Sequence, residues 1–274
     1  MELKTGHSHC DYQSYPPAES TGFKPMNIFA KLVGFLRFIW FWVSFWSMTL
    51  ILYIWMVFRH VYLRLTNGDT KRDAHKVACA WGQAVFTLNP GWTCQIHGRE
   101  NLPNEDQGAV LIANHSSAMD ICALMTTHIQ FRWLSKTMVF KMPLMGGAMR
   151  WAGYVPIDRG NKSSHREAMT MSANWIKNNV SMLFFPEGTR SATGELKPFK
   201  SGAFRLAQDT NVPIVPIVID GTNRLMNKGS LIPRPAHVNI HVLPATRKGE
   251  DETIDAFTNR VRDLILRQQE QNKK

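Results

Sequence analysis

The chain has 274 residues, enough for one large domain or for a domain with an accessory segment. Its 32 lysines and arginines outnumber its 21 aspartates and glutamates, and the formal net charge of +11 favours anionic partners such as a phosphorylated substrate or a membrane surface. There is no nucleic-acid-binding signature and no C-x-x-C zinc spacing, so neither nucleic acid nor a metal ion is an expected partner.

Residues 1–26 form a polar, turn-rich segment, which predicts a flexible N-terminal tail. This segment holds His7, His9 and Cys10 close together in sequence. Because a flexible tail offers no fixed coordination geometry, these residues do not predict a metal site.

Residues 27–90 are predicted to form membrane-associated helices. Residues 38–58 read FIWFWVSFWSMTLILYIWMVF, without charge, glycine or proline. An apolar helix of about 20 residues can cross the roughly 30 Å hydrocarbon layer of a bilayer. Because tryptophan prefers the headgroup boundary, a helix lying slanted or re-entrant within one leaflet is an alternative to a span. Apolar residues recur at helical spacing between 70 and 88, which predicts a second helix.

Residues 91–274 are predicted to form one α/β domain with a mixed, mostly parallel sheet flanked by helices. A C-terminal amphipathic helix with a frayed end is predicted from residue 254. Ligands of such sheets bind at the carboxyl ends of strands. The predicted strands lie at residues 93–98, 109–113, 131–135, 181–185, 213–219 and 238–243, and the predicted helices at 121–127, 163–178 and 201–209.

The stretch NHSSAMD, at 114–120, follows a predicted strand and contains His115 and Asp120. On one continuous helix, five residues leave two side chains about 140° apart, so the two can pair only if His115 lies in the loop before the helix. A carboxylate on one ring nitrogen orients the imidazole, and the other nitrogen can then take a proton from an alcohol. From this pair alone, an acidic residue at a helix N-terminus beside a surface histidine is the alternative.

The stretch FPEGTRS, at 185–191, follows another predicted strand and brings Glu187, Gly188, Thr189 and Arg190 together. Glycine lets the backbone approach a ligand closely. A hydroxyl and a guanidinium suit a phosphate group. A strand exit with a surface ion pair is the alternative for this motif.

Two further motifs complete the pattern. In GYVPIDRGN, at 153–161, Arg159 is a second candidate anion ligand or an ion-pair partner of Asp158. In VPIVPIVI, at 212–219, two prolines interrupt a hydrophobic strand, which places them at an edge or an irregular position.

In order and spacing, these four blocks resemble the lysophospholipid acyltransferase family: N-H-x4-D, G-x-x-x-I-D-R, F-P-E-G-T-R and V-P-I-V-P. The resemblance covers roughly residues 70–245 and implies a glycerolipid acyltransferase-like fold with an N-terminal membrane-embedded segment. It implies that His115 is the general base and that Asp120 orients it. The residues that it implies for binding the acceptor's glycerol phosphate are Glu187, Gly188, Thr189, Arg190 and Arg159.

The resemblance also implies a reaction and a setting. A fatty acyl group would move from acyl-CoA or acyl-carrier protein directly to the sn-2 hydroxyl of 1-acyl-sn-glycerol 3-phosphate (lysophosphatidic acid), forming phosphatidic acid. No covalent acyl-enzyme and no cofactor are expected. The enzyme would work at a phospholipid membrane, with its catalytic domain facing the cytoplasm, at a bacterial inner membrane. The larger basic cluster after the apolar run agrees with that orientation.

Two stretches depart from the family pattern, and in one of them Val155 and Pro156 stand where an aromatic residue is frequent. Where relatives often carry K-x-E-L, this chain reads SKTMVFKMP, with Lys136 and Lys141 basic and no glutamate. Lys136 is a further candidate for substrate binding. The departure leaves another acceptor, such as lyso-ornithine lipid or a different lysophospholipid, as an alternative. A membrane lipid-binding protein without catalysis is a third hypothesis, and the absence of a G-x-S-x-G elbow leaves serine hydrolysis without support.

Overall fold

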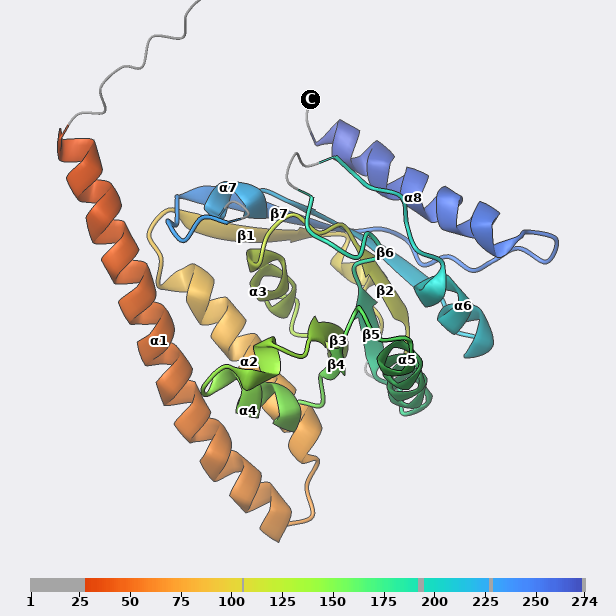
Figure 1. Ribbon diagram of the computed structural model, residues 1–274, viewed down its shortest axis with the longest axis horizontal. Helices are drawn as coiled ribbons and strands as arrows, with labels where there is room; N and C mark the ends of the chain where they lie inside the picture. Colours follow the sequence, from red (N-terminus) through yellow and green to blue (C-terminus); the bar gives the residue numbers. More distant parts are fainter. Residues whose placement is uncertain (1–27, 105, 192–194, 227–228, 273–274) are drawn as a thin grey trace, which may run out of the picture.

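The computed structural model describes residues 28–104, 106–191, 195–226 and 229–272. The predicted tail at 1–26, with His7, His9 and Cys10, lies outside the described residues. Helices pack on both faces of a central sheet, and one long helix runs along the side of the domain (Figure 1).

The described strands form a seven-stranded sheet in the order β1-β7-β6-β2-β5-β3-β4. Every neighbouring pair is parallel except β6 with β7. This confirms the predicted mixed, mostly parallel sheet. The strands are β1 (Trp92–His97), β2 (Val110–Ala113), β3 (Phe131–Lys136), β4 (Val155–Ile157), β5 (Ser181–Phe184), β6 (Ile214–Asp220) and β7 (Ala236–Val242).

The helices divide between the two faces of the sheet. Side chains of α5, α6 and α8 pack against one face, and those of α1, α2, α3, α4 and α7 build the core on the other. The α-helices are α1 (Ile28–Leu65), α2 (Thr70–Thr87), α3 (Met119–Met125), α4 (Met145–Trp151), α5 (Lys162–Lys177), α6 (Gly202–Asp209), α7 (Thr222–Leu225) and α8 (Ile254–Gln271); the 3-10 helices are Arg99–Asn101 and Val139–Lys141.

Three short elements were not predicted from the sequence. β4 has three residues with a proline at its centre, and α7 is a single turn, so neither carries a readable period. α4 contains two adjacent glycines, which disfavour helix until tertiary contacts stabilise it. The expected frayed end of the C-terminal helix was wrong, because α8 continues through its charged and amide side chains to Gln271.

α1 is longer than the apolar run predicted at 38–58 and packs against the domain over much of its length. The indole of Trp81 donates to the Thr49 hydroxyl over 2.9 Å, and Arg59 pairs with Asp73 at 2.7 Å. Among the described residues, the stretch Lys31–Leu65 is the one helix long and apolar enough to cross a membrane, with 17% of its most apolar window buried. α1 also exposes large apolar side chains on its outer side, including Leu50, Ile51 and Ile54.

Candidate active site

The predicted site residues gather at one edge of the sheet. Five adjacent strands of the sheet, β6, β2, β5, β3 and β4, all run parallel to one another. Their carboxyl ends therefore lie at the same edge of the sheet. His115 follows β2, and Glu187 to Arg190 follow β5. Lys136 ends β3, and Arg159 follows β4. Strand order brings together residues that are up to 75 positions apart in the sequence.

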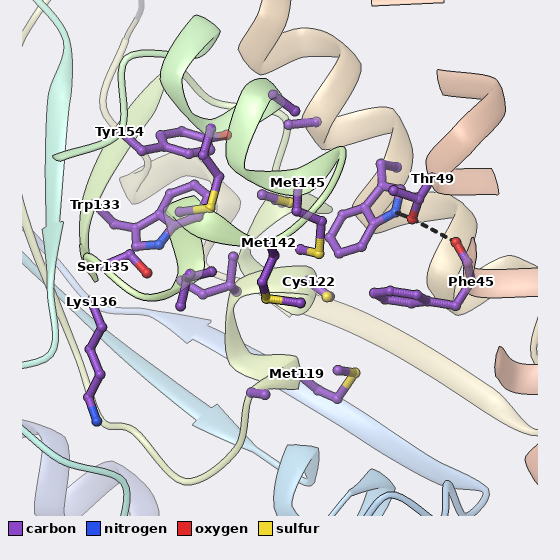
Figure 2. A pocket seen from close by; sticks show the side chains of 18 of the residues that line it. Phe45, Thr49, Met119, Cys122, Trp133, Ser135, Lys136, Met142, Met145 and Tyr154 are labelled. Atoms are coloured by element: carbon purple, nitrogen blue, oxygen red, sulfur yellow. Dashed lines mark hydrogen bonds between the residues drawn. The ribbon is translucent and has the colours of Figure 1, made fainter. Parts of the chain in front are cut away.

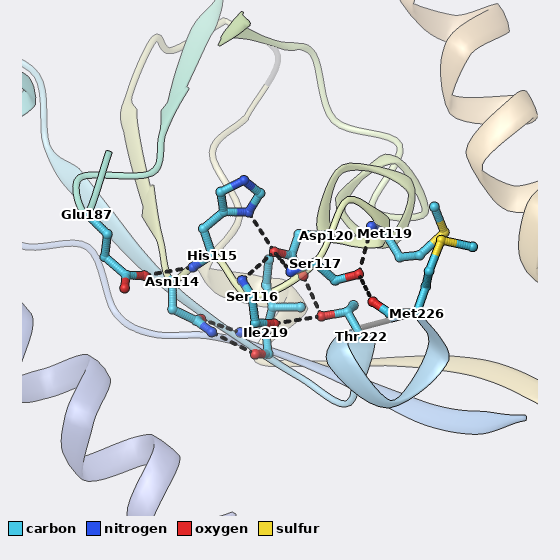
Figure 3. A network of polar contacts seen from close by, with 10 residues as sticks. All are labelled: Asn114, His115, Ser116, Ser117, Met119, Asp120, Glu187, Ile219, Thr222 and Met226. Carbon is cyan, nitrogen blue, oxygen red and sulfur yellow. Dashed lines mark hydrogen bonds and ion pairs between the residues drawn. The ribbon is translucent and has the colours of Figure 1, made fainter. Parts of the chain in front are cut away.

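His115 lies in the loop before α3, and Asp120 lies in the first turn of that helix. Nδ1 of His115 is 2.7 Å from Oδ2 of Asp120, so the geometric prediction for this pair is confirmed (Figure 3). The imidazole also stacks on the ring of Phe185, with 4.1 Å between centroids and 20° between planes. Nε2 points away from Asp120 (Figure 3). A ring held at one nitrogen in this way is suited to act as a base at the other.

Asp120 is completely buried, and both of its carboxylate oxygens are occupied. Oδ2 accepts the backbone N–H groups of Ser116 and Ser117, over 2.8 and 3.0 Å, besides the His115 bond. Because those two donors fix the carboxylate as an acceptor, Nδ1 of His115 carries the proton. Oδ1 accepts the hydroxyl of Thr222, at the start of α7 (Figure 3). A buried carboxylate is tolerated when all of its oxygens are bonded in this way.

Glu187 was predicted to bind substrate, but its carboxylate is buried among backbone donors and does not line the cavity described below. Oε1 accepts the N–H of His115 over 2.8 Å, and Oε2 accepts the N–H of Lys197 over 3.2 Å. Burial raises the pKa of the Glu187 carboxyl, and those two hydrogen bonds partly offset the rise. The observed role of Glu187 is therefore to join the His115 loop to the segment after β5.

Gly188 has a φ of +74°, a conformation that side chains disfavour. Its carbonyl oxygen accepts a hydrogen bond from the Arg159 guanidinium, and a Cβ at this position would lie 3.2 Å from Cε and Nζ of Lys200. Nζ of Lys197 lies 3.1 Å from the Thr189 hydroxyl. The loop after β5 is thus held by cationic side chains from two other segments.

A cavity of about 770 Å³ opens beside this edge, and it is lined by five of the predicted residues: His115, Lys136, Arg159, Thr189 and Arg190. Gly188 does not line it. Figure 2 shows Lys136 on one side, Phe45 and Met119 on the other, and Met142 between them. A cavity that joins cationic groups to an apolar interior suits an amphiphile with an anionic headgroup. Most of the remaining lining is apolar, including Trp42, Trp46, Leu52, Met56, Trp81, Met125, Met145, Met149 and Met226.

Comparison with known proteins places the chain in a family. A family model described as Acyltransferase matches residues 93–220. A 1-acyl-sn-glycerol-3-phosphate acyltransferase of Chlamydomonas reinhardtii is 31% identical over 252 residues, covering 90% of this chain and 74% of that protein. The chain belongs to the 1-acyl-sn-glycerol-3-phosphate acyltransferase family. A chloroplastic protein of that name from Brassica napus is 36% identical over 200 residues, covering 73% of this chain and 58% of the relative.

A solved structure shows that the fold of this chain is shared. The crystal structure of the 1-acyl-sn-glycerophosphate acyltransferase from Thermotoga maritima matches with a TM-score of 0.76 at 24% identity, covering 89% of this chain and 97% of that one. The matched region spans 58% and 56% of the length of the chloroplastic relatives from Brassica napus and Arabidopsis thaliana.

Two groups at this site were not predicted from the sequence. Phe185 stands inside the FPEGTRS motif but was not recognised as a support for the imidazole. Thr222 is 102 residues from Asp120 and follows β6 in the polar stretch DGTNR. The rule that polar segments gather at the carboxyl ends of parallel strands would have indicated Thr222. Among the described residues, no group of three or more His, Cys, Asp or Glu side chains is placed to hold a metal ion.

Proposed function

We propose that this acyltransferase moves a fatty acyl group from acyl-CoA or acyl-carrier protein to the sn-2 hydroxyl of 1-acyl-sn-glycerol 3-phosphate, forming phosphatidic acid. The observation that carries the proposal is one cavity lined by His115, Arg159 and Arg190 that continues among apolar side chains. The guanidinium groups suit the acceptor's phosphate, and the apolar part suits acyl chains. The names of the relatives support the same reaction.

The proposed chemistry is a direct transfer with His115 as general base. Nε2 takes the proton of the sn-2 hydroxyl as its oxygen attacks the carbonyl carbon of the donor thioester. The tetrahedral intermediate then collapses with cleavage of the C–S bond, and the imidazolium returns the proton to the leaving thiolate. Asp120 keeps the ring in the required tautomer and stabilises the imidazolium.

Four residues are proposed to hold the acceptor's phosphate: Arg159, Thr189, Arg190 and Lys136, all on the cavity wall. Arg190 would supply a two-pronged contact of the kind that guanidinium makes with phosphate. Glu187 and Gly188 are proposed to contribute indirectly, because Glu187 anchors the His115 loop and Gly188 accepts from Arg159.

We infer that α1 lies in the membrane and places the cavity next to the lipid. Its outer face exposes large apolar side chains, while Phe45, Leu52 and Met56 of the same helix line the cavity. The donor and acceptor are both amphiphiles, so a cavity wall shared with a membrane-embedded helix shortens their path from the bilayer. The catalytic domain is proposed to face the cytoplasm, at a bacterial inner membrane.

An acceptor panel tests the reaction. Purified protein is given one labelled acyl donor and, in turn, lysophosphatidic acid, lysophosphatidylglycerol and lyso-ornithine lipid, first with acyl-CoA and then with acyl-carrier protein. We expect labelled phosphatidic acid as the main product. Transfer to another lysolipid with none to lysophosphatidic acid would assign a different acceptor, and transfer to none of them would contradict the acyltransferase activity itself.

Replacing Thr222 with valine is expected to lower kcat about tenfold, because it removes a hydrogen bond to a buried carboxylate. Valine fills nearly the same volume, so the change is confined to the hydroxyl. Thr222→Ser keeps that hydroxyl and is the matched control, with kcat expected near the wild-type value. Steady-state kinetics at saturating acceptor measures the effect, and equal kcat values for the two variants would show that Thr222 does not support Asp120.

A further inference from the structure

A second, small cleft of about 20 Å³ lies outside the active site, where three segments far apart in the sequence meet. Arg37 and Trp40 come from α1, Trp92 from the start of β1, and Pro233 and Arg234 from the segment between α7 and β7. The cleft shares no lining residue with the cavity that contains His115. It is therefore a separate feature of the surface.

The cleft is positively charged and has no acidic side chain in its wall. Arg37 and Arg234 are both exposed, and neither forms an ion pair with a residue in the described part of the chain. α1 contains no aspartate or glutamate, and neither does the stretch GSLIPRP at 229–235. Two guanidinium groups on one cleft without a counter-charge favour an anion between them.

Apolar side chains surround this charge on the outside of the molecule. Leu231 is 61% exposed and Ile232 is 53% exposed, immediately before Arg234 in the chain. α1 exposes Leu36, Ile39 and Trp40 as well. Apolar residues followed by an arginine, next to an exposed tryptophan, are typical of a surface that meets both the hydrocarbon and the headgroup layer of a membrane.

The cleft is held together by two indole hydrogen bonds. Nε1 of Trp42 donates to the carbonyl oxygen of Leu231 over 3.1 Å, which ties the segment after α7 to α1. Nε1 of Trp40 donates to the carbonyl oxygen of Leu88 over 2.8 Å, which ties α1 to the end of α2. The positions of Arg37 and Arg234 are therefore fixed by anchored backbone, although both side chains reach solvent.

We propose that Arg37 and Arg234 form a binding site for the phosphodiester headgroup of an anionic membrane phospholipid, distinct from the site of acyl transfer. The acyl chains of that lipid lie along the exposed apolar face of α1, next to Leu231 and Ile232. The site rests on the membrane association that forms part of the proposed function. It sets the depth of α1 at the headgroup layer and draws the protein to anionic lipid.

The test compares two charge-matched double variants of the full chain. R37Q/R234Q removes both guanidinium groups of the cleft. R166Q/R267Q removes two exposed arginines from α5 and α8, which cover the sheet face away from α1. Partition is measured by flotation with vesicles of phosphatidylcholine alone and of phosphatidylcholine mixed with an equal part of phosphatidylglycerol. Turnover of substrate in detergent micelles checks that each variant is folded.

Wild-type protein is expected to prefer the mixed vesicles, and R37Q/R234Q to partition onto them at least about tenfold more weakly, with R166Q/R267Q close to wild type. Equal losses in the two variants would overturn the site, because charge alone would then explain binding. Wild-type protein that floats with neither vesicle would overturn membrane association, which separates that failure from the failure of the headgroup site alone.

Discussion

Replacing Asp120 with asparagine is expected to lower kcat by about 10²–10⁴-fold while the protein keeps its fold. The amide oxygen can take the place of Oδ2 and accept from Ser116 and Ser117, and the amide nitrogen can face the Thr222 oxygen. The substitution therefore removes the negative charge and leaves most of the local hydrogen bonding. What is lost is stabilisation of the imidazolium that is proposed to form on His115 during transfer.

Single-turnover kinetics with saturating lysophosphatidic acid measures that loss without interference from product release. The rate of the His115→Ala variant is expected to fall at least as far, because this change removes the proposed base itself. Both variants should unfold at a temperature close to that of the wild type and should still float with lipid vesicles. Turnover within a few-fold of wild type in either variant would contradict general-base catalysis by this pair.

Replacing Arg190 with alanine is expected to raise KM for lysophosphatidic acid by about 10–100-fold, the effect of losing one charge-assisted contact to the phosphate. Arg190 lines the cavity with His115, and its backbone carbonyl is held by Nζ of Lys197 over 3.3 Å. Arg190→Lys keeps the positive charge but loses the planar guanidinium group that can make two parallel hydrogen bonds to phosphate, so an intermediate KM is expected.

The KM for the acyl donor provides the control for the two Arg190 variants. KM for the acyl thioester should change little in either variant, because the proposed contact is with the acceptor alone. Arg166→Ala, on the far side of the sheet, serves as the matched loss of one exposed arginine. An increase in both KM values, or the same increase in the Arg166 variant, would argue against a specific phosphate contact at Arg190.

The strands and the longer helices could be predicted because their patterns are local. The apolar runs that became β2 and β5 are buried on both faces, as is typical of parallel strands covered by helices on both sides. The prolines in 212–219 predicted an edge or an irregular position, but Pro216 lies within β6, which is a central strand between β7 and β2. β4 and α7 could not be predicted because elements of three or four residues are too short to show a periodic hydrophobic pattern. α4 could not be predicted because its two glycines have a low helix propensity. Each of these elements depends on packing against strands or helices that are distant in the sequence.

The candidate site also has one part that could be predicted from the sequence and one part that could not. Helical geometry required His115 to lie in the loop and Asp120 in the first turn, and a separation of five residues sufficed for that deduction. The sequence placed Glu187 among the substrate ligands, but the fold turned its carboxylate toward the backbone N–H groups of His115 and Lys197. No local pattern distinguishes those two roles, since both require an acidic residue at the end of a strand.

By itself the sequence determined the α/β class, the apolar helix before the domain, and the identity and local geometry of the histidine and aspartate pair. Only the tertiary structure decided that Thr222 supports Asp120, that Phe185 stacks on His115, and that Arg37 and Arg234 line one cleft outside the active site. The physical reason is the separation along the chain over which each kind of interaction acts. Periodicity and turn chemistry act over a few residues, whereas these contacts depend on strand order and on how α1 packs against the domain, which are set by long-range packing.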